Sequence, residues 1–329
     1  MRMNRQTKPL KPWHGVIVLG LSAVCVFLIG PALGEHMGLY GTLVSELLLL
    51  LVAVGCTWIF QGDFRSVFPI RKPTFYGMFG TFLLWMGVLI LTLALTMLIT
   101  YFFPAEMLGT SMGLSYTFMG VPALVAVVIV AVMPAFCEEA VFRGVVFNSF
   151  WPLGRGNKWI PIILTGCIFG AFHGSIWRFF PTAILGIAMA YILAETGNMV
   201  YAMFFHAINN LLPLLMTFAL QFVWRIIYFA SNSSYDAAIY GASADYGISF
   251  ASVGVYIAGS GIGLFFIYIG NFLLHRGRPG YEGKIFSGKR KRHLYILIIA
   301  SAVLFFLGIA SIVGSAAAQG LGYMMRYHH

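Results

Sequence analysis

The uninterrupted apolar stretch LLWMGVLILTLALTMLITYFF occupies residues 83–103 of this chain. It contains no charged residue, and polar side chains do not alternate with apolar ones along it. An α-helix rises about 1.5 Å per residue, so about 20 apolar residues cross a hydrocarbon layer roughly 30 Å thick. A membrane-spanning β-strand would instead need about ten residues of alternating polarity. The stretch therefore predicts a transmembrane helix and argues against a β-barrel.

The composition of the whole chain extends this prediction. Hydrophobic types make up 60% of its 329 residues and charged types only 9%, whereas about a quarter of the residues of a soluble domain are charged. So few polar side chains could not cover so large an apolar core in water. We therefore predict an all-α fold, a polytopic transmembrane helical bundle of about eight or nine spans.

Nine segments of the sequence are candidate spans. The fifth and sixth are short, so we expect them to be tilted or broken near Pro181, where the helix loses a hydrogen-bond donor. The candidate spans are residues 15–33, 39–60, 76–103, 121–150, 160–173, 181–194, 199–220, 248–274 and 294–317.

The basic residues are distributed unevenly between the two ends of these spans. With the N-terminus in the cytoplasm, sixteen of the 20 lysines and arginines fall on the cytoplasmic side, and the segment 276–292 carries the largest group. Lysine and arginine are enriched in cytoplasmic loops of membrane proteins. The pattern predicts a multi-pass protein of the cell membrane with a cytoplasmic N-terminus and an outer C-terminus. It also accounts for the net charge of +10 through contact with anionic lipid headgroups, without a nucleic-acid partner.

Cysteine and glycine positions add two smaller predictions. The four cysteines lie inside apolar stretches without CxxC spacing, which predicts buried thiols rather than disulfides or zinc ligands. The pair Gly259-xxx-Gly263 in the eighth span predicts a close approach of another helix.

Ionisable residues inside the spans are the strongest functional signal. Each costs roughly 2.5–3.5 kcal/mol at the centre of a membrane helix, so each needs a partner or a purpose. The fourth span contains Glu138, Glu139 and Arg143. Glu139 and Arg143 are four apart and can pair on one helical face, whereas Glu138 points about 100° away from Glu139. We therefore expect a structural ion pair beside a carboxylate that is available for chemistry, although one structural cluster of all three residues is the alternative.

Two further polar sites follow on separate spans. Of eight histidines, only His173 and His206 lie within spans, and Asn210 follows one turn after His206. Counted from the cytoplasmic ends at 1.5 Å per residue, Glu138, His173, His206 and Asn210 lie roughly 18, 20, 11 and 17 Å deep. These depths predict that a carboxylate, two imidazoles and an amide meet in one site.

Such a site suits peptide hydrolysis. A carboxylate shielded from bulk water can take a proton from a bound water molecule. Imidazole and amide donors can then stabilise the oxyanion that forms on the attacked carbonyl. Glu138, His173 and His206 could alternatively be the three ligands of a catalytic zinc with an open position for water.

The three motifs together resemble the CPBP family of intramembrane proteases, which groups type II CAAX prenyl endopeptidases with bacterial Abi and bacteriocin-processing proteins. The resemblance covers roughly residues 121–218 and implies that Glu138 activates water with His173. It further implies that Glu139 and Arg143 support the site, and that His206 and Asn210 complete it and stabilise the oxyanion. The motifs that carry it are Glu138-Glu139-xxx-Arg143, Phe169-xxx-His173 and His206-xxx-Asn210. Three regions follow: N-terminal transmembrane helices at 1–120, a CPBP-like catalytic core at 121–220, and a C-terminal loop with two transmembrane helices at 221–329.

Two functional alternatives and the question of metal stay open at this stage. The chain could be a catalytically silent membrane scaffold or a bacteriocin immunity or regulatory protein. A proton-relaying transporter is disfavoured because such folds often contain inverted repeats, and the sequence shows none. Candidate ligands on three separate helices favour a glutamate-dependent hydrolase over a zinc enzyme, because zinc-binding histidines in proteases often sit four apart on one helix. The expected partners are the lipid bilayer and a membrane-bound protein or peptide substrate.

Overall fold

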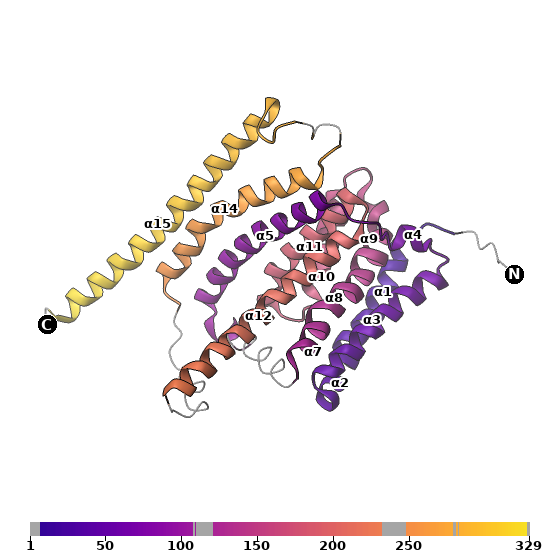
Figure 1. The fold of residues 1–329 in the computed structure, drawn as a ribbon, viewed down its shortest axis with the longest axis horizontal. Helices are drawn as coiled ribbons and strands as arrows, with labels where there is room; N and C mark the ends of the chain where they lie inside the picture. The colour runs from indigo at the N-terminus through magenta and orange to yellow at the C-terminus, as the bar shows by residue number, and fades with distance from the viewer. Residues whose placement is uncertain are drawn as a thin grey trace.

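A computed structural model describes residues 7–107, 109, 121–231, 248–278, 281 and 283–327. Within these ranges the protein is a bundle of long helices with no β-strand (Figure 1). The helices before the central segment are α1 (Pro12–Val24), α2 (Gly30–Met37), α3 (Leu39–Ile59), α4 (Phe64–Val67) and α5 (Phe75–Phe102). The later ones are α10 (Trp159–Ala171), α11 (Ile176–Thr196), α12 (Met199–Ser231), α14 (Phe250–Leu274) and α15 (Lys291–Tyr327).

Eight helices in the described ranges are long and apolar enough to cross a membrane, and α10 is a shorter apolar helix. The prediction of a polytopic transmembrane bundle is therefore confirmed. The expected break near Pro181 is wrong, because Pro181 lies inside the continuous helix α11. The chain turns earlier, at Gly174, whose φ of +64° is a backbone conformation that glycine adopts without steric cost.

The central segment is one long rod in which α-helix alternates with wider π-helical turns. It runs through α7 (Ala123–Val127), η2 (Val128–Val132), α8 (Met133–Glu139), η3 (Ala140–Val146), α9 (Phe147–Phe150) and η4 (Trp151–Gly154). The two π segments lie directly before and after α8, which carries both glutamates. Such π-turns often occur at functional sites, because each one changes the direction in which the following side chains point.

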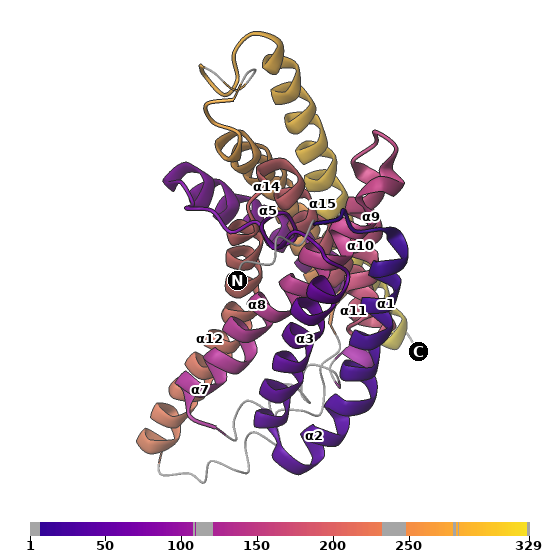
Figure 2. The same ribbon diagram turned by 90° about the vertical axis from the view of Figure 1, so that its right-hand side faces the viewer.

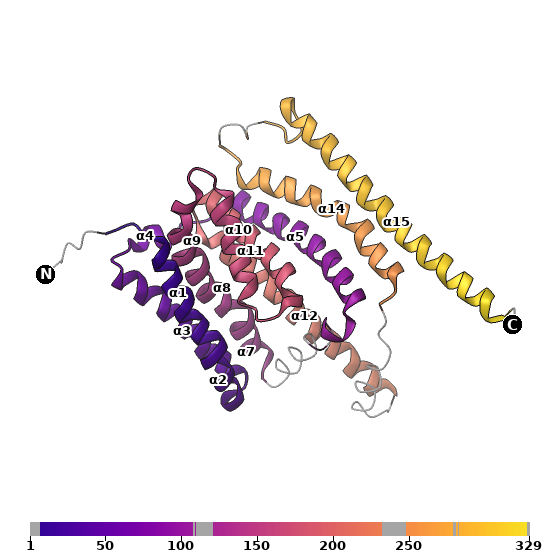
Figure 3. The ribbon, with the colours of Figure 1, turned by 180° about the vertical axis from the view of Figure 1, so that it is seen from behind.

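The helices are arranged side by side around this rod. Helices α1, α2 and α3 lie on one side, whereas α5, α14 and α15 follow one another outward on the other, with α15 at the edge (Figures 1 and 3). The view turned by 90° shows α7 and α8 close to α12 (Figure 2), and α8 and α12 are in contact. The rod is therefore enclosed by helices from before and after it in the chain.

Glycines allow the closest helix contacts on the outer side. A Cβ on Gly80 would lie 2.7 Å from the Gly270 carbonyl oxygen, and a Cβ on Gly87 would lie 2.5 Å from that of Gly263. Helices α5 and α14 therefore approach backbone to backbone. The prediction from the glycine pair in α14 is right for Gly263 but wrong for Gly259, which has nothing within 4 Å of its Cβ position among the described residues.

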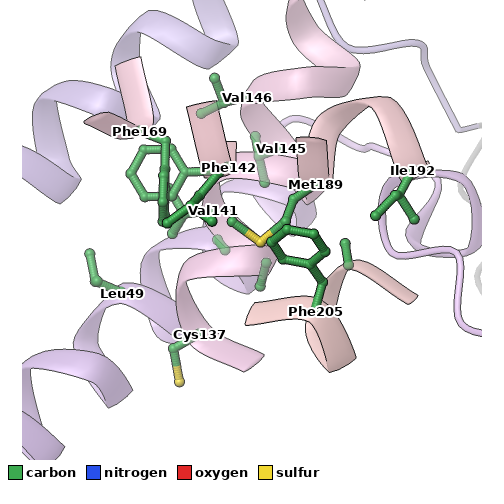
Figure 4. Packing of buried hydrophobic residues seen from close by; sticks show 14 of the residues in the cluster. Leu49, Cys137, Val141, Phe142, Val145, Val146, Phe169, Met189, Ile192 and Phe205 are labelled. Carbon is green, nitrogen blue, oxygen red and sulfur yellow. The ribbon is translucent and has the colours of Figure 1, made fainter. Parts of the chain in front are cut away.

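The apolar core surrounds the second half of the rod. Phe142 meets Phe169 of α10 edge-on, with ring centroids 5.2 Å apart, and Phe205 of α12 is fully buried on the other side of the rod (Figure 4). The four cysteines are free thiols, and all but Cys167 are buried, as predicted.

Loops from several parts of the chain meet at one end of the bundle. The backbone of Lys8 bonds to that of Gln61, and the side chain of Asn198 bonds to the backbone of Arg71. Glu195 accepts hydrogen bonds from Lys158 and from His275. This end carries the loops that the sequence predicts to be cytoplasmic.

Candidate functional site

A fully buried ion pair forms the base of the candidate site. Arg143 donates from Nη1 to Oε1 of Glu139 over 2.8 Å, and neither side chain is exposed. Its Nη2 donates to the Gly186 carbonyl of α11 over 3.0 Å, and its guanidinium lies 4.4 Å from the ring centroid of Phe169 in α10. One arginine thus connects the rod to two neighbouring helices, as the predicted supporting role requires.

Glu139 also orients the histidine of α12. Nδ1 of His206 lies 2.9 Å from Oε1 of Glu139. Since a carboxylate can only accept, Nδ1 carries the proton and Nε2 of a neutral ring is left with a free lone pair. That Nε2 lies 3.9 Å from Oε2 of Glu138. A carboxylate behind a histidine fixes its tautomer and orientation in many catalytic and metal sites.

Glu138 faces a cavity of about 270 Å³ that opens beside the rod. Its side chain is 20% exposed, in contrast to the buried Glu139. The cavity is lined by Val26, Gly30, Pro31, Thr42, Ser45, Glu46, Leu49, Glu138, Phe142, Phe172 and His173. Adjacent glutamates on one helix therefore have different surroundings, one in a salt bridge and one at a cavity wall.

His173 reaches the same cavity from the turn after α10. Its Nδ1 lies 2.9 Å from the Phe169 carbonyl oxygen, which can only accept, so Nδ1 is the protonated nitrogen and Nε2 is the one free to bind water. The ring of Phe169 packs against both histidines, at 4.9 Å from His173 and 5.6 Å from His206. The structure thus brings together Glu138, Glu139, His173 and His206, as their depths in the sequence predict.

Asn210 lies one turn beyond His206 but does not reach the cavity wall. Its Nδ2 donates to the Val130 carbonyl of η2 over 3.2 Å. The cavity lining includes neither Asn210 nor His206. In this conformation Asn210 connects α12 to the rod, and a contact with an oxyanion would require its amide to leave the Val130 carbonyl.

Two residues at the site were missed by sequence reasoning. Glu46 of α3 lines the cavity and is 6% exposed. Its position in the sequence could have indicated it, because it is an acidic residue inside an apolar span. Arg178, which is not among the predicted site residues, lies in the first turn of α11, and its charge acts on Glu138 and His173.

The side chains present do not fit a preformed metal site. Within the described ranges, no group of three or more histidine, cysteine, aspartate or glutamate side chains has the spacing to hold a metal ion. Of the two histidines, His173 lines the cavity together with Glu138, whereas His206 lies outside the lining with Nε2 3.9 Å from Oε2 of Glu138. The arrangement can hold a water molecule between a carboxylate and imidazole nitrogens.

Comparison with known proteins gives one match. Residues 120–212 match the family model described as type II CAAX prenyl endopeptidase Rce1-like. The matched segment covers under a third of the chain, and it contains Glu138, Glu139, Arg143, Phe169, His173, His206 and Asn210. No curated protein and no solved structure matches the chain.

Proposed function

Because its segment 120–212 identifies this integral membrane protein with the CPBP family of intramembrane proteases, we propose that it is an endopeptidase that cleaves a membrane-associated protein or peptide. The observation that carries the proposal is the position of Glu138. It is the glutamate of the adjacent pair that faces a cavity, and it has an imidazole nitrogen 3.9 Å away.

In the proposed reaction Glu138 is the general base. It takes a proton from a water molecule in the cavity while the water oxygen bonds to the carbonyl carbon of the substrate. The carbon–nitrogen bond then breaks and the amine leaves with the proton held by Glu138. His173, which lines the same cavity with Nε2 free, holds the water or the developing oxyanion.

The remaining residues hold this arrangement in place. Glu139 fixes the His206 ring by its bond to Nδ1, and Arg143 pairs with Glu139 and connects it to α10 and α11. His206 presents Nε2 to Glu138 and can donate to it when protonated. Asn210 stabilises the oxyanion only if substrate binding releases it from the Val130 carbonyl. A mechanism without a metal ion is the one that these side chains support, since the spacing of the described residues does not gather three ligands.

Purified protein in liposomes and a fluorogenic prenylated CAAX peptide anchored in the same bilayer provide the direct test. We expect cleavage by the wild type and none by Glu138→Gln, which keeps the size of the side chain but cannot accept the proton. If neither protein cleaves it, comparative proteomics of membranes containing wild type or Glu138→Gln will show whether another peptide accumulates uncut. A membrane proteome with no such difference would refute proteolysis and favour a silent scaffold.

A further inference from the structure

Glu46 is the one carboxyl at the cavity that comes from outside the matched segment 120–212, among the residues that the structure describes. It lies in the middle of α3, which packs against α8, and it is almost completely buried. Its Oε2 has no hydrogen-bond partner in the described part of the chain. A buried polar atom without a partner usually marks a functional group or a bound water molecule.

Glu46 and Glu138 line the same cavity from the packed helices α3 and α8, an arrangement in which one carboxyl can donate a hydrogen bond to the other. Two carboxylates cannot bond in this way, because both only accept; the bond requires that one of the two carries a proton. Glu46 is more deeply buried than Glu138. A neutral group is less costly to bury than a charged one, so the proton belongs on Glu46 and the negative charge on Glu138.

The surroundings of the pair contain few other charges. Cys137, the residue before Glu138, is a buried free thiol, His173 shares the cavity, and Arg178 in the first turn of α11 is the cation whose charge acts on Glu138. The residues from the π-helical turn η1 (Cys25–Ile29), α2 and η3 that line the cavity are Val26, Gly30, Pro31 and Phe142, none of which titrates. Within the described ranges, Glu46 therefore has no ion-pair partner that would stabilise it as a carboxylate.

We propose that Glu46 is a positioning residue for Glu138, holding a proton that it donates in a hydrogen bond to the Glu138 carboxylate. The bond fixes the orientation of the base, and the single proton of the pair lets Glu138 stay ionised while Glu46 stays neutral. The proton on Glu46 is not consumed, since the proton that Glu138 takes from water leaves with the product amine. The predicted effect of Glu46 on catalysis rests on the proposed function. The proton shared by the two carboxyls, however, can be detected in a protein that is not cleaving substrate.

The first test is infrared spectroscopy of the purified protein at neutral pH. We expect the carbonyl stretching band of a protonated carboxylic acid, sensitive to deuterium exchange, in the wild type. The band should disappear or shift in Glu46→Gln and shift in Glu138→Gln. The matched control is Glu35→Gln, the same substitution at an exposed carboxyl of α2, which should leave the band unchanged. A band that is the same in Glu46→Gln and wild type would overturn the proposal, whether or not the protein is a protease.

The second test uses the liposome assay. The amide introduced by Glu46→Gln can still donate a hydrogen bond to Glu138, so we expect this variant to keep kcat near that of wild type. The acidic limb of its pH–activity profile should move to higher pH, because an amide is a weaker hydrogen-bond donor than a carboxylic acid and stabilises the ionised Glu138 less. Glu46→Ala removes the donor, and kcat should fall about 10-fold or more with little change in KM. An active wild type whose pH profile is unchanged in Glu46→Gln would overturn the proposal. An inactive wild type would refute the proposed function and leave the infrared result to decide the role of Glu46.

Discussion

Replacing Arg143 by methionine should destabilise the protein far more than an average substitution. Arg143 is fully buried, pairs with Glu139 and donates to the Gly186 carbonyl. Methionine fills much of the same volume but leaves the Glu139 carboxylate without its cation. The variant therefore measures mainly the electrostatic contribution of Arg143 to the free energy of unfolding.

The expected magnitude follows from the least costly way to remove the stranded charge, which is to protonate the carboxyl. An ordinary glutamic acid has a pKa of about 4.3, so protonation at pH 7 costs about 3.7 kcal/mol. The hydrogen bond from His206 stabilises the ionised Glu139, so keeping the charge in place costs less than it would without this bond and can cost less than full protonation. We therefore expect the free energy of unfolding to fall by about 3 kcal/mol, in line with the cost of breaking other buried pairs.

A double-mutant cycle separates this effect from lost packing. In Glu139→Gln/Arg143→Met no buried charge is stranded, so the double variant should recover at least about 1 kcal/mol relative to Arg143→Met alone. The assay is equilibrium unfolding in mixed micelles, together with the yield of monodisperse protein. Equal stability of Arg143→Met and wild type, or a double variant less stable than Arg143→Met, would refute the reasoning.

Three further predictions concern the site, the metal and the topology. Alanine at Glu138, His173 or His206 should lower kcat/KM by about 100-fold or more while the protein still purifies as a monodisperse species; full activity of the Glu138 variant would rule out the mechanism. Chelator-stripped protein should retain its activity and contain no stoichiometric zinc by elemental analysis, and restoration of lost activity by added zinc would contradict this. Reporter fusions at Lys8 and Gly288 should both be cytoplasmic, and an outer location of Gly288 would contradict the predicted arrangement of the spans.

The sequence alone was sufficient for the parts of this protein that depend on position along a helix axis. Apolar stretches of about 20 residues predict spans because the hydrocarbon layer has a fixed thickness. The same rise per residue predicted that Glu138, His173 and His206 lie at similar depths, and the structure brings them together. The i, i+4 spacing predicted the pair of Glu139 with Arg143.

Only the tertiary structure decided what depends on the direction around each axis and on which helices are neighbours. Depth could not show that Glu46 of α3 lines the same cavity as Glu138, or that the Asn210 amide is bound to the Val130 carbonyl. Nor could a glycine motif show that Gly263 packs against α5 while a Cβ built on Gly259 would have no described atom of another element within 4 Å. The π-turns that flank α8 change how far each side chain is rotated about the axis, so a regular 3.6-residue period cannot predict these directions.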